Sequence, residues 1–406
     1  MQVKDRSWLT LTVTTAIQAL VSMAALTMPV LASLIGASMG ISSTIVAGAL
    51  AAVVYLGAML GTLLAGAMVQ RWGAVRTSQL GLVLCAAGLG LASAGWMSMA
   101  FMGAFVIGLG YGPITPASSH LLVRSTAPRF MSLVFSIKQT GVPLGGLLAG
   151  ALAPALGLLM GWRATLVALA VPCLVVAFAS QGLRARLDRD SNPNATMKWR
   201  RVFEPVGMVM KVAPLRRLAL CSLLFTGAQL SVTAYSVVYL HEVLGVGLVE
   251  AGLMLSVAQC GGIMGRIGWG YASDAWMGAR ITLMVLAAVM ASGALGMALL
   301  TVGSPAWVMT TVMLCFGAAA IGWNGVYLAE VARSAPKGLA AAATGGTLFF
   351  TFFGNVIAPL VLSGVVYALG GLREAYAFLV LPLLVAGLLM HRGTSRRPQD
   401  VAWREP

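Results

Sequence analysis

Long apolar runs, separated by short turns that carry charge, glycine or proline, fill the sequence from end to end. A helix that crosses a bilayer needs about 20 mostly apolar residues. The runs predict twelve such helices, at 8–35, 41–69, 77–97, 99–123, 130–158, 163–182, 216–240, 248–272, 280–302, 306–329, 338–366 and 374–391. With 59% hydrophobic and 9% charged residues, the chain lies outside the range of soluble proteins. We therefore expect an all-α polytopic membrane protein, not a soluble enzyme with one anchor.

The longest break between runs divides the predicted helices six and six. It predicts an N-terminal six-helix bundle at 1–182, a partly helical linker at 183–215 and a C-terminal six-helix bundle with a short tail at 216–406. The halves also repeat, since Arg124-Ser-Thr-Ala-Pro-Arg129 after the fourth helix matches Arg333-Ser-Ala-Pro-Lys337 after the tenth. A parallel repeat of this kind predicts two bundles that move against each other around a site near the membrane midplane.

The formal charge of +15 is distributed by topology. With both termini on one side, that side holds 22 of the 26 Lys and Arg residues, and the opposite turns hold only Arg163 and Arg373. Basic residues stay on the cytoplasmic side of membrane proteins. This asymmetry predicts a multi-pass inner-membrane protein with both termini in the cytoplasm, and it leaves no charge that needs a nucleic-acid partner.

The turn after the second helix has a weaker copy after the eighth. The two read Gly66-Ala-Met-Val-Gln70-Arg71-Trp72-Gly73-Ala-Val-Arg76 and Gly270-Tyr-Ala-Ser-Asp274-Ala275-Trp276-Met-Gly278-Ala-Arg280. These turns and the six-plus-six repeat resemble the major facilitator superfamily of secondary transporters over essentially the whole chain. The resemblance implies a conformational lock at Gly66, Arg71, Gly73 and Arg76. Gln70 stands where the family usually has an acid, and the second copy keeps Asp274, so the lock is expected to include Asp274, Arg124, Glu330 and Arg333.

Two further motifs bear on the substrate. Gly265-Arg266-Ile-Gly-Trp-Gly270-Tyr-Ala-Ser273-Asp274 resembles the eighth helix of the monocarboxylate and oxalate/formate branches, which implies that Arg266 holds a substrate carboxylate. Gln139-Thr-Gly141-Val-Pro143-Leu-Gly145-Gly146 in the fifth helix is partly similar to a signature of drug/proton antiporters, with its spacing off by one residue. Carboxylate transport is therefore the first expectation, and drug efflux is the alternative.

Lys138 and Arg266 are the two charged residues deep inside predicted spans. Lys138 lies eight residues after Phe130 and Arg266 eight residues before Asp274, about 12 Å along each axis from the cytoplasmic end, and so near the middle of a hydrocarbon core of about 30 Å. A charge there is costly unless it faces a cavity or a partner. We expect the two side chains to clamp an anion, one from each bundle. The alternatives are an ion pair of Arg266 with Asp274, or side chains that extend to the cytoplasmic surface.

Polar and aromatic side chains inside the spans are candidates for the wall of a binding cavity, although each could equally be a helix-packing contact. They are Gln18, Gln139, Tyr111, Gln229, Tyr235, Tyr239, Gln259, Trp323, Asn324 and Asn355. The carboxylates Glu242, Glu250, Glu330 and Glu374 fall near span ends, which disfavours a site for a cationic substrate. Glycines and prolines at 110–116 predict a bend in the fourth helix.

Together these features predict a secondary active transporter of a small organic anion, driven by protons or by an exchanged anion. We expect a monomer surrounded by membrane lipids, with no enzymatic activity, cofactor or metal. The alternatives are a hydrophobic drug/proton antiporter and, from another class, a membrane sensor or channel without coupled transport.

Overall fold

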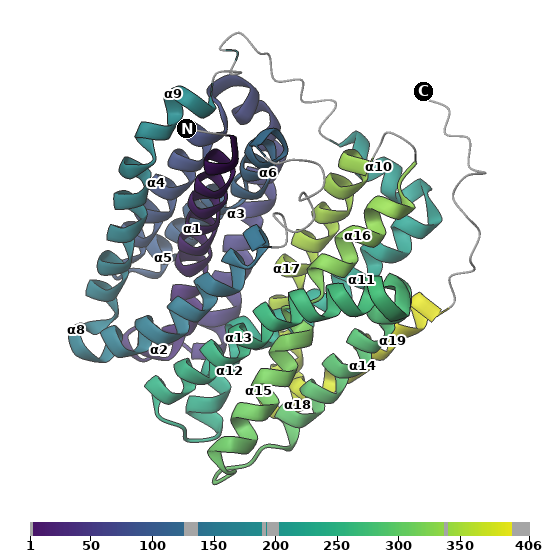
Figure 1. Cartoon of the computed structure of the whole chain (residues 1–406). Coiled ribbons are helices and arrows are strands. Elements are labelled where there is room, and N and C mark those ends of the chain that lie inside the picture. The colour runs from purple at the N-terminus through teal and green to yellow at the C-terminus, as the bar shows by residue number, and fades with distance from the viewer. Residues whose placement is uncertain (1–2, 126–136, 189–191, 193–202, 337–339, 392–406) are drawn as a thin grey trace.

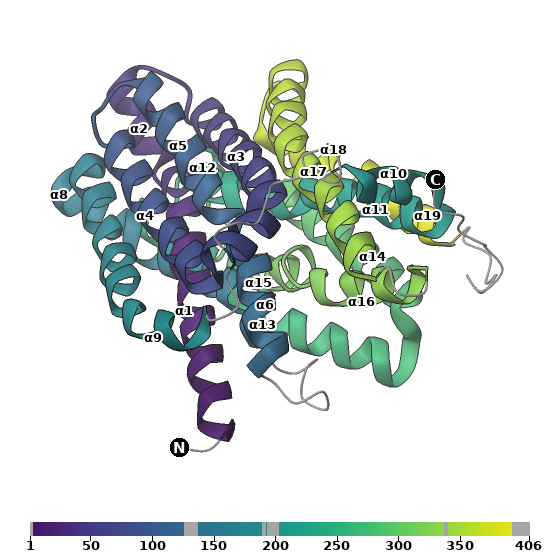
Figure 2. The ribbon, with the colours of Figure 1, turned by 90° about the horizontal axis from the view of Figure 1, so that it is seen from above.

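The computed structural model describes residues 3–125, 137–188, 192, 203–336 and 340–391, and the regular structure in these residues is helical. We call the elements from α1 to α9 the N-half and those from α10 to α19 the C-half; the two lie side by side (Figures 1 and 2). The N-half comprises α1 (Val3–Val30), α2 (Ala32–Met39), α3 (Ser43–Trp72), α4 (Ala74–Ala92), α5 (Met97–Tyr111), α6 (Ile114–Ser125), α8 (Gly141–Ala179) and α9 (Gln181–Leu187).

The C-half follows the same order of long helices and short breaks. It comprises α10 (Glu204–Lys211), α11 (Ala213–Leu230), η3 (Ser231–Tyr235), α12 (Ser236–Val238), η4 (Tyr239–Val243), α13 (Leu248–Ala272), η5 (Ser273–Met277), α14 (Gly278–Leu299), α15 (Ala306–Ala320), α16 (Asn324–Ser334), α17 (Ala340–Leu369), α18 (Leu372–Phe378) and α19 (Val380–His391). The elements η3, η4 and η5 are π-helical.

Ten stretches of the described chain are long and apolar enough to cross a membrane. Two of them, Ile137–Arg184 with 48 residues and Leu248–Leu299 with 52, are far too long for one crossing, because 48 helical residues extend about 72 Å. Each contains a break at a glycine with positive φ: Gly161 has φ 80 and ψ 154, and Gly278 has φ 71 and ψ 154. Only glycine adopts such values easily. Each long stretch therefore holds two spans, and the predicted all-α fold with twelve spans is confirmed.

The fourth and tenth spans are broken near their middles. The fourth is interrupted between α5 and α6 at Gly112 and Pro113, within the stretch where a bend is predicted. The tenth changes from α15 to α16 at residues 321–323. These breaks lie beside Tyr111 and Trp323, so two of the proposed cavity residues occupy equivalent positions in the two halves.

Close contacts between the halves include several near one end of the bundles, which we call the far end: the end where α3 and α13 begin and where Gly161 reverses the chain. There α8 packs on α13 and α3 packs on α17. Gly150 and Gly252 allow α8 and α13 to approach closely, and the Ser256 hydroxyl donates to the Leu147 carbonyl over 2.9 Å. The Ser43 hydroxyl also donates to the Glu242 carboxylate across the two halves.

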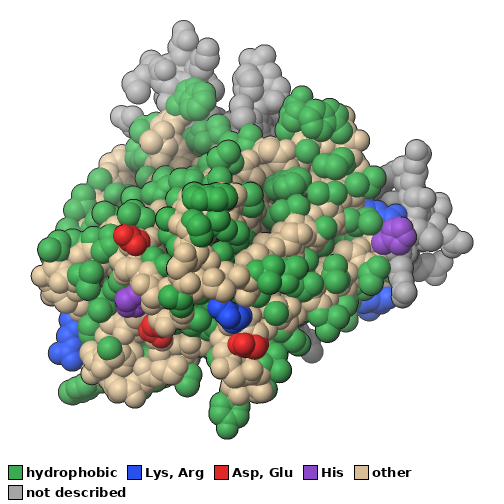
Figure 3. Space-filling model, turned by 90° about the horizontal axis from the view of Figure 1, so that it is seen from below, with side chains coloured by type: hydrophobic (Ala, Val, Ile, Leu, Met, Phe, Trp, Pro, Cys, Tyr) green, Lys and Arg blue, Asp and Glu red, His purple; other side chains and the backbone are tan. Residues whose placement is uncertain are grey.

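The outer surface is largely apolar. Large side chains such as Leu159, Phe178 and Tyr367 are exposed by 81%, 76% and 93%. Figure 3 shows hydrophobic side chains over much of one face, with few charged ones among them. Extended apolar surfaces are typical of regions that bind protein or membrane. Here the exposed apolar side chains belong to the predicted membrane spans. The surface is that of a multi-pass membrane protein surrounded by lipid.

Candidate functional site

Lys138 is a buried cation held by neutral groups. Its side chain is 1% exposed, and its Nζ donates to the Gln18 Oε1 over 2.9 Å and to the Thr115 Oγ1 over 3.2 Å. The Thr115 hydroxyl in turn donates to the same Gln18 oxygen over 3.1 Å. Among the residues that the structure describes, no carboxylate pairs with Lys138. Three spans therefore fix the ammonium group, but none of them neutralises it.

Two glycines of α8 bring Lys138 to these partners. A side chain at Gly141 would collide with the Thr15 carbonyl and with Gln18, and one at Gly145 would collide with Ala19 and Ser22. The absence of side chains lets α8 lie directly against α1. The two glycines, one and two turns after Lys138, thus let the helices approach closely and place Gln18 opposite Lys138.

Arg266 comes from α13 in the C-half and reaches the N-half. Its Nη1 donates to the Gln139 backbone carbonyl over 2.9 Å, while its Nε is buried and has no partner among the described residues. The contact to Gln139 is through the backbone, not through the glutamine side chain. Because Gln139 directly follows Lys138, this hydrogen bond places Arg266 beside the backbone that carries Lys138. The structure thus brings the two predicted cations together, with one contributed by each half.

The alternative ion pair of Arg266 with Asp274 is not observed. Asp274 pairs instead with Arg333, with 3.8 Å between Oδ1 and Nη1. Lys138 is buried and Arg266 is partly buried, and two like charges in such surroundings repel each other. The repulsion between Lys138 and Arg266 therefore destabilises the empty protein, and an anion bound between them would remove it.

Tyr111 is the last residue of α5, at the break in the fourth span. It interacts electrostatically with Arg266 and lies beside the Ser22 hydroxyl of α1. Its ring meets Tyr55 of α3 edge to face, with 6.5 Å between centroids. A site at the cation pair therefore has one aromatic wall, built from the broken fourth span and the second span.

Gln259 lies on α13 beyond Arg266, toward the far end. Its side chain is 1% exposed and its Nε2 has no hydrogen-bond partner among the described residues. A side chain at Gly146 of α8 would collide with this carboxamide. Gln259 therefore occupies space that a glycine of the opposite half leaves open.

The remaining polar candidates of the C-half form a separate group. Trp323 is fully buried, donates through Nε1 to the Gln229 Oε1 over 3.0 Å, and packs edge to face on Phe225 and Tyr327. Asn355 on α17 is 4% exposed and its Oδ1 has no partner among the described residues. Asn324 begins α16 and is partly buried.

Tyr235 and Tyr239 have packing roles. The Tyr235 hydroxyl donates to the Pro359 carbonyl over 3.0 Å and lies 3.2 Å from the Ser363 Oγ, beside Gly48 of α3. The Tyr239 hydroxyl donates to the Met297 carbonyl over 2.9 Å. Both hydroxyls are thus satisfied within the C-half. The structure does not bring either one to the cation pair.

The predicted N-half lock has a carboxylate that comes from the linker. Asp188, only 7% exposed, accepts hydrogen bonds from the backbone N–H groups of Val75 and Arg76 over 2.8 and 3.0 Å. Its carboxylate lies directly against Gly73, where any side chain would collide with it. Asp188 therefore caps the first turn of α4 and provides an acid at the turn where position 70 is glutamine.

The other predicted lock residues of the N-half lie in α3, α4 and α6 and at the turn between α3 and α4. Gly66 and Arg71 lie in α3, and the Arg71 and Arg76 side chains are exposed. Arg124 lies in α6, and its side chain is outside the described part of the structure. In this structure the best-defined element of the N-half lock is thus the Asp188 cap on α4.

Replacing Asp188 with alanine is expected to lower the stability of the protein by about 1–2 kcal/mol, because the first turn of α4 loses a charged cap. Thermal unfolding of the purified protein measures the change. Asp188→Asn is the matched control, since it keeps one acceptor oxygen and should lose less. Equal melting temperatures for the wild type and both variants would contradict the assignment.

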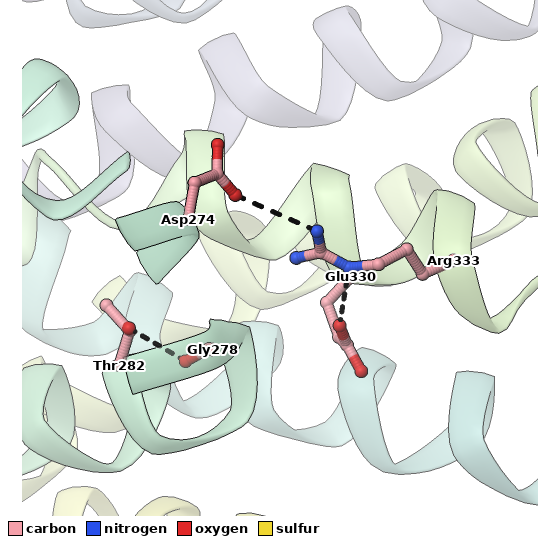
Figure 4. A network of polar contacts seen from close by, with 5 residues as sticks. All are labelled: Asp274, Gly278, Thr282, Glu330 and Arg333. Atoms are coloured by element: carbon pink, nitrogen blue, oxygen red, sulfur yellow. Dashed lines mark hydrogen bonds and ion pairs between the residues drawn. The ribbon is translucent and has the colours of Figure 1, made fainter. Parts of the chain in front are cut away.

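The predicted C-half lock forms a small ion-pair network (Figure 4). Arg333 donates to the Glu330 Oε2 over 3.1 Å and pairs with Asp274. The Arg333 and Asp274 side chains are 51% and 74% exposed, so solvent screens the pair. The contact joins α16 to η5 within the C-half, and it contributes little to stability on its own.

Comparisons with known proteins agree with this architecture. The family model described as Major Facilitator Superfamily matches residues 11–359. The curated proteins give no match. Among solved structures, the nucleoside transporter NupG superposes with a TM-score of 0.78 at 13% identity, covering 94% of this chain and 99% of that one.

Two further solved transporter structures superpose on this chain over a similar share of their length. A POT family transporter in complex with 5-aminolevulinic acid has a TM-score of 0.75 at 13% identity, with 94% of this chain and 95% of that one covered. A D-xylose-proton symporter has a TM-score of 0.72 at 17% identity, with 96% and 98% covered. At these identities the likeness shows the fold alone, and the substrate has to be inferred from the site.

Proposed function

The chain belongs to the major facilitator superfamily of secondary transporters, and on that premise we propose that it carries a small organic anion, in particular a carboxylate, by alternating access. The observation that supports this most strongly is a pair of cations from opposite halves without a described counter-ion: Lys138, which is buried, and Arg266, which is partly buried. A carboxylate between them would neutralise charge and satisfy the open donor at Arg266 Nε. A carboxylate bound between Lys138 and Arg266 would also link the N-half to the C-half at this site.

The proposal also includes the orientation of the chain in the membrane and the driving force for transport. We propose an inner-membrane location with both termini in the cytoplasm, as the distribution of basic residues favours. The far end then faces outward, and its contacts between the halves support an outward-closed state. A proton or a counter-anion supplies the driving force, and the transporter acts as a monomer.

Thermal stabilisation of the purified protein tests the substrate class, because a ligand that binds only the folded state raises its stability. The screen compares monocarboxylates and dicarboxylates with lipophilic cations. We expect a concentration-dependent rise with carboxylates and none with cations. Stabilisation by lipophilic cations alone would instead support the hydrophobic drug/proton antiporter, and conductance without a ligand would support a channel.

A further inference from the structure

We infer that Gln18 is a positioning residue for Lys138: it holds the ammonium group in place with a neutral oxygen and so leaves the positive charge for the substrate. The inference rests on the proposed function, because it gives Gln18 a role in the same site that differs from direct contact with the substrate. It comes from the Gln18 carboxamide, which is fully buried and hydrogen-bonded at both its oxygen and its nitrogen.

The oxygen of the Gln18 carboxamide has no capacity left for a ligand. An ammonium group donates hydrogen bonds and accepts none, so the end of the carboxamide that faces the Lys138 Nζ over 2.9 Å must be the oxygen. The Thr115 hydroxyl donates to the same oxygen over 3.1 Å. A carbonyl oxygen has two lone pairs, and these two donors use both. An anionic substrate offers acceptors, so it could not bond to this oxygen in any case.

The rest of the Gln18 side chain is fixed by its surroundings. Its Nε2 donates to the Ser22 Oγ, one turn further along α1, over 3.4 Å. Its Cβ and Cγ lie directly against Gly141 of α8, where an added side chain would approach them to 2.9 and 3.2 Å. Close packing of this kind leaves a side chain little freedom to turn toward a ligand. Gln18 therefore influences binding through Lys138.

A neutral partner and a charged partner at position 18 have opposite consequences for the site. A carboxylate at the place of the Gln18 oxygen, 2.9 Å from the Lys138 Nζ, would form a buried ion pair and cancel the lysine charge before the substrate arrives. The carboxamide oxygen fixes the position of Nζ without cancelling its charge. The empty protein therefore keeps an uncompensated cation, at a cost in stability, and an anionic substrate gains the attraction that an internal carboxylate would otherwise take.

Gln18→Glu tests this role most sharply, because it changes the charge and almost nothing else. Glutamate has the shape of glutamine and keeps an acceptor for Lys138 and Thr115. We expect the melting temperature without ligand to rise, since the buried ammonium group gains a counter-ion. The affinity for a carboxylate should fall on the order of 100-fold, because the charge that attracts the anion is already neutralised.

Gln18→Leu separates positioning from neutralisation. Leucine removes the acceptor, so the ammonium group keeps its charge but loses the partner that fixes its place. We expect a melting temperature below that of the wild type and a loss of affinity of about tenfold, because the site is less preorganised. The order of affinities is then wild type, Gln18→Leu, Gln18→Glu, while the order of melting temperatures is Gln18→Glu, wild type, Gln18→Leu. A residue that served only in packing would not give these two different orders.

Two controls show whether pairing with Lys138 is responsible. In a Lys138→Met background, Gln18→Glu buries a carboxylate without a cation, so there it should lower the melting temperature. Gln79→Glu is the matched control at another buried glutamine of the N-half. The Gln79 Nε2 donates to the Ala177 carbonyl and to the Gln181 Oε1, each over 2.9 Å, and a carboxylate cannot make these bonds. This control should melt below the wild type and bind carboxylates with wild-type affinity.

Thermal unfolding and titration calorimetry of the purified full chain give the two readouts, with acetate, benzoate and succinate as probes and the tightest of them used for the variants. Wild-type affinity in Gln18→Glu, a Gln18→Glu variant that melts below the wild type, or equal losses of affinity in the glutamate and leucine variants would overturn the inference while leaving carboxylate transport intact. A wild type that none of the three probes stabilises would overturn the proposed function, and this inference with it.

Discussion

Replacement of Lys138 by methionine is expected to lower carboxylate uptake on the order of 100-fold while the protein stays folded. Loss of one partner from a buried charged contact costs about 2–5 kcal/mol, and each 1.4 kcal/mol corresponds to a factor of ten in binding. Methionine matches the length and shape of lysine without its charge. Gln18 and Thr115 keep their mutual hydrogen bond of 3.1 Å after the change, so no new buried group is left unsatisfied.

Initial rates in proteoliposomes measure the Lys138 effect, with thermal unfolding as the check on folding. Lys211→Met is the matched control, because it removes a lysine from the exposed end of α10, outside the spans. We expect wild-type uptake from this control. Near-normal uptake by Lys138→Met would show that the ammonium group takes no part in binding.

Changes at Arg266 should fall into a graded series. Arg266→Gln removes the charge and should lower uptake on the order of 100-fold, for the same reason as the lysine change. Arg266→Lys keeps the charge but loses the planar fork that bonds to Gln139 and to a carboxylate at once, so an intermediate loss of about tenfold is expected.

The matched control for this series is Arg163→Gln. Arg163 lies beside the Gly161 break, where it stacks over Trp162 with 5.3 Å to the ring centroid. It is exposed and lies beyond the Gly161 break, in the span that follows the one carrying Lys138. Its variant should transport like the wild type. Equal losses in Arg266→Lys and Arg266→Gln would mean that geometry alone matters at this position, and no loss in either would remove Arg266 from the site.

Much of the fold could be predicted from local properties of the sequence. Apolar run length identifies spans because the bilayer core has a fixed thickness. The Gly161 and Gly278 breaks fall in predicted turns, and the fourth span is interrupted at the glycine and proline of residues 112 and 113. Lys138 and Arg266 could be found in the same way, since a charge inside an apolar run is unusual in itself.

The contacts around these cations could not be predicted in the same way, because they depend on which helix faces meet. Thr115 is one hydroxyl among many, and only the packing of α6 against α1 makes it a partner of Lys138. The pairing of Gln259 with Gly146 depends on the register of α13 against α8. Asn324 and Asn355 were equally plausible from sequence, but the structure gives neither a described contact with the cation pair.

The burial of Asp188 could not be predicted from the composition of its segment. It stands in a charge-rich segment predicted to be a linker, where an exposed side chain is the usual expectation. Its burial depends on the short helix α9, which docks Leu187 against Val69, Ala74 and Val75. Likewise, Asp274 is near Arg266 in sequence, but its side chain pairs with Arg333 from another span.

A double-mutant cycle on Lys138 and Arg266 tests the central claim most directly. Titration calorimetry of the carboxylate that stabilises the wild type best is carried out on the wild type, Lys138→Met, Arg266→Gln and the double variant. If both cations hold one anion, each single change should weaken binding on the order of 100-fold, and the double change should cost much less than the product of the two. Single variants that bind as tightly as the wild type, or losses that simply multiply, would contradict the two-cation site.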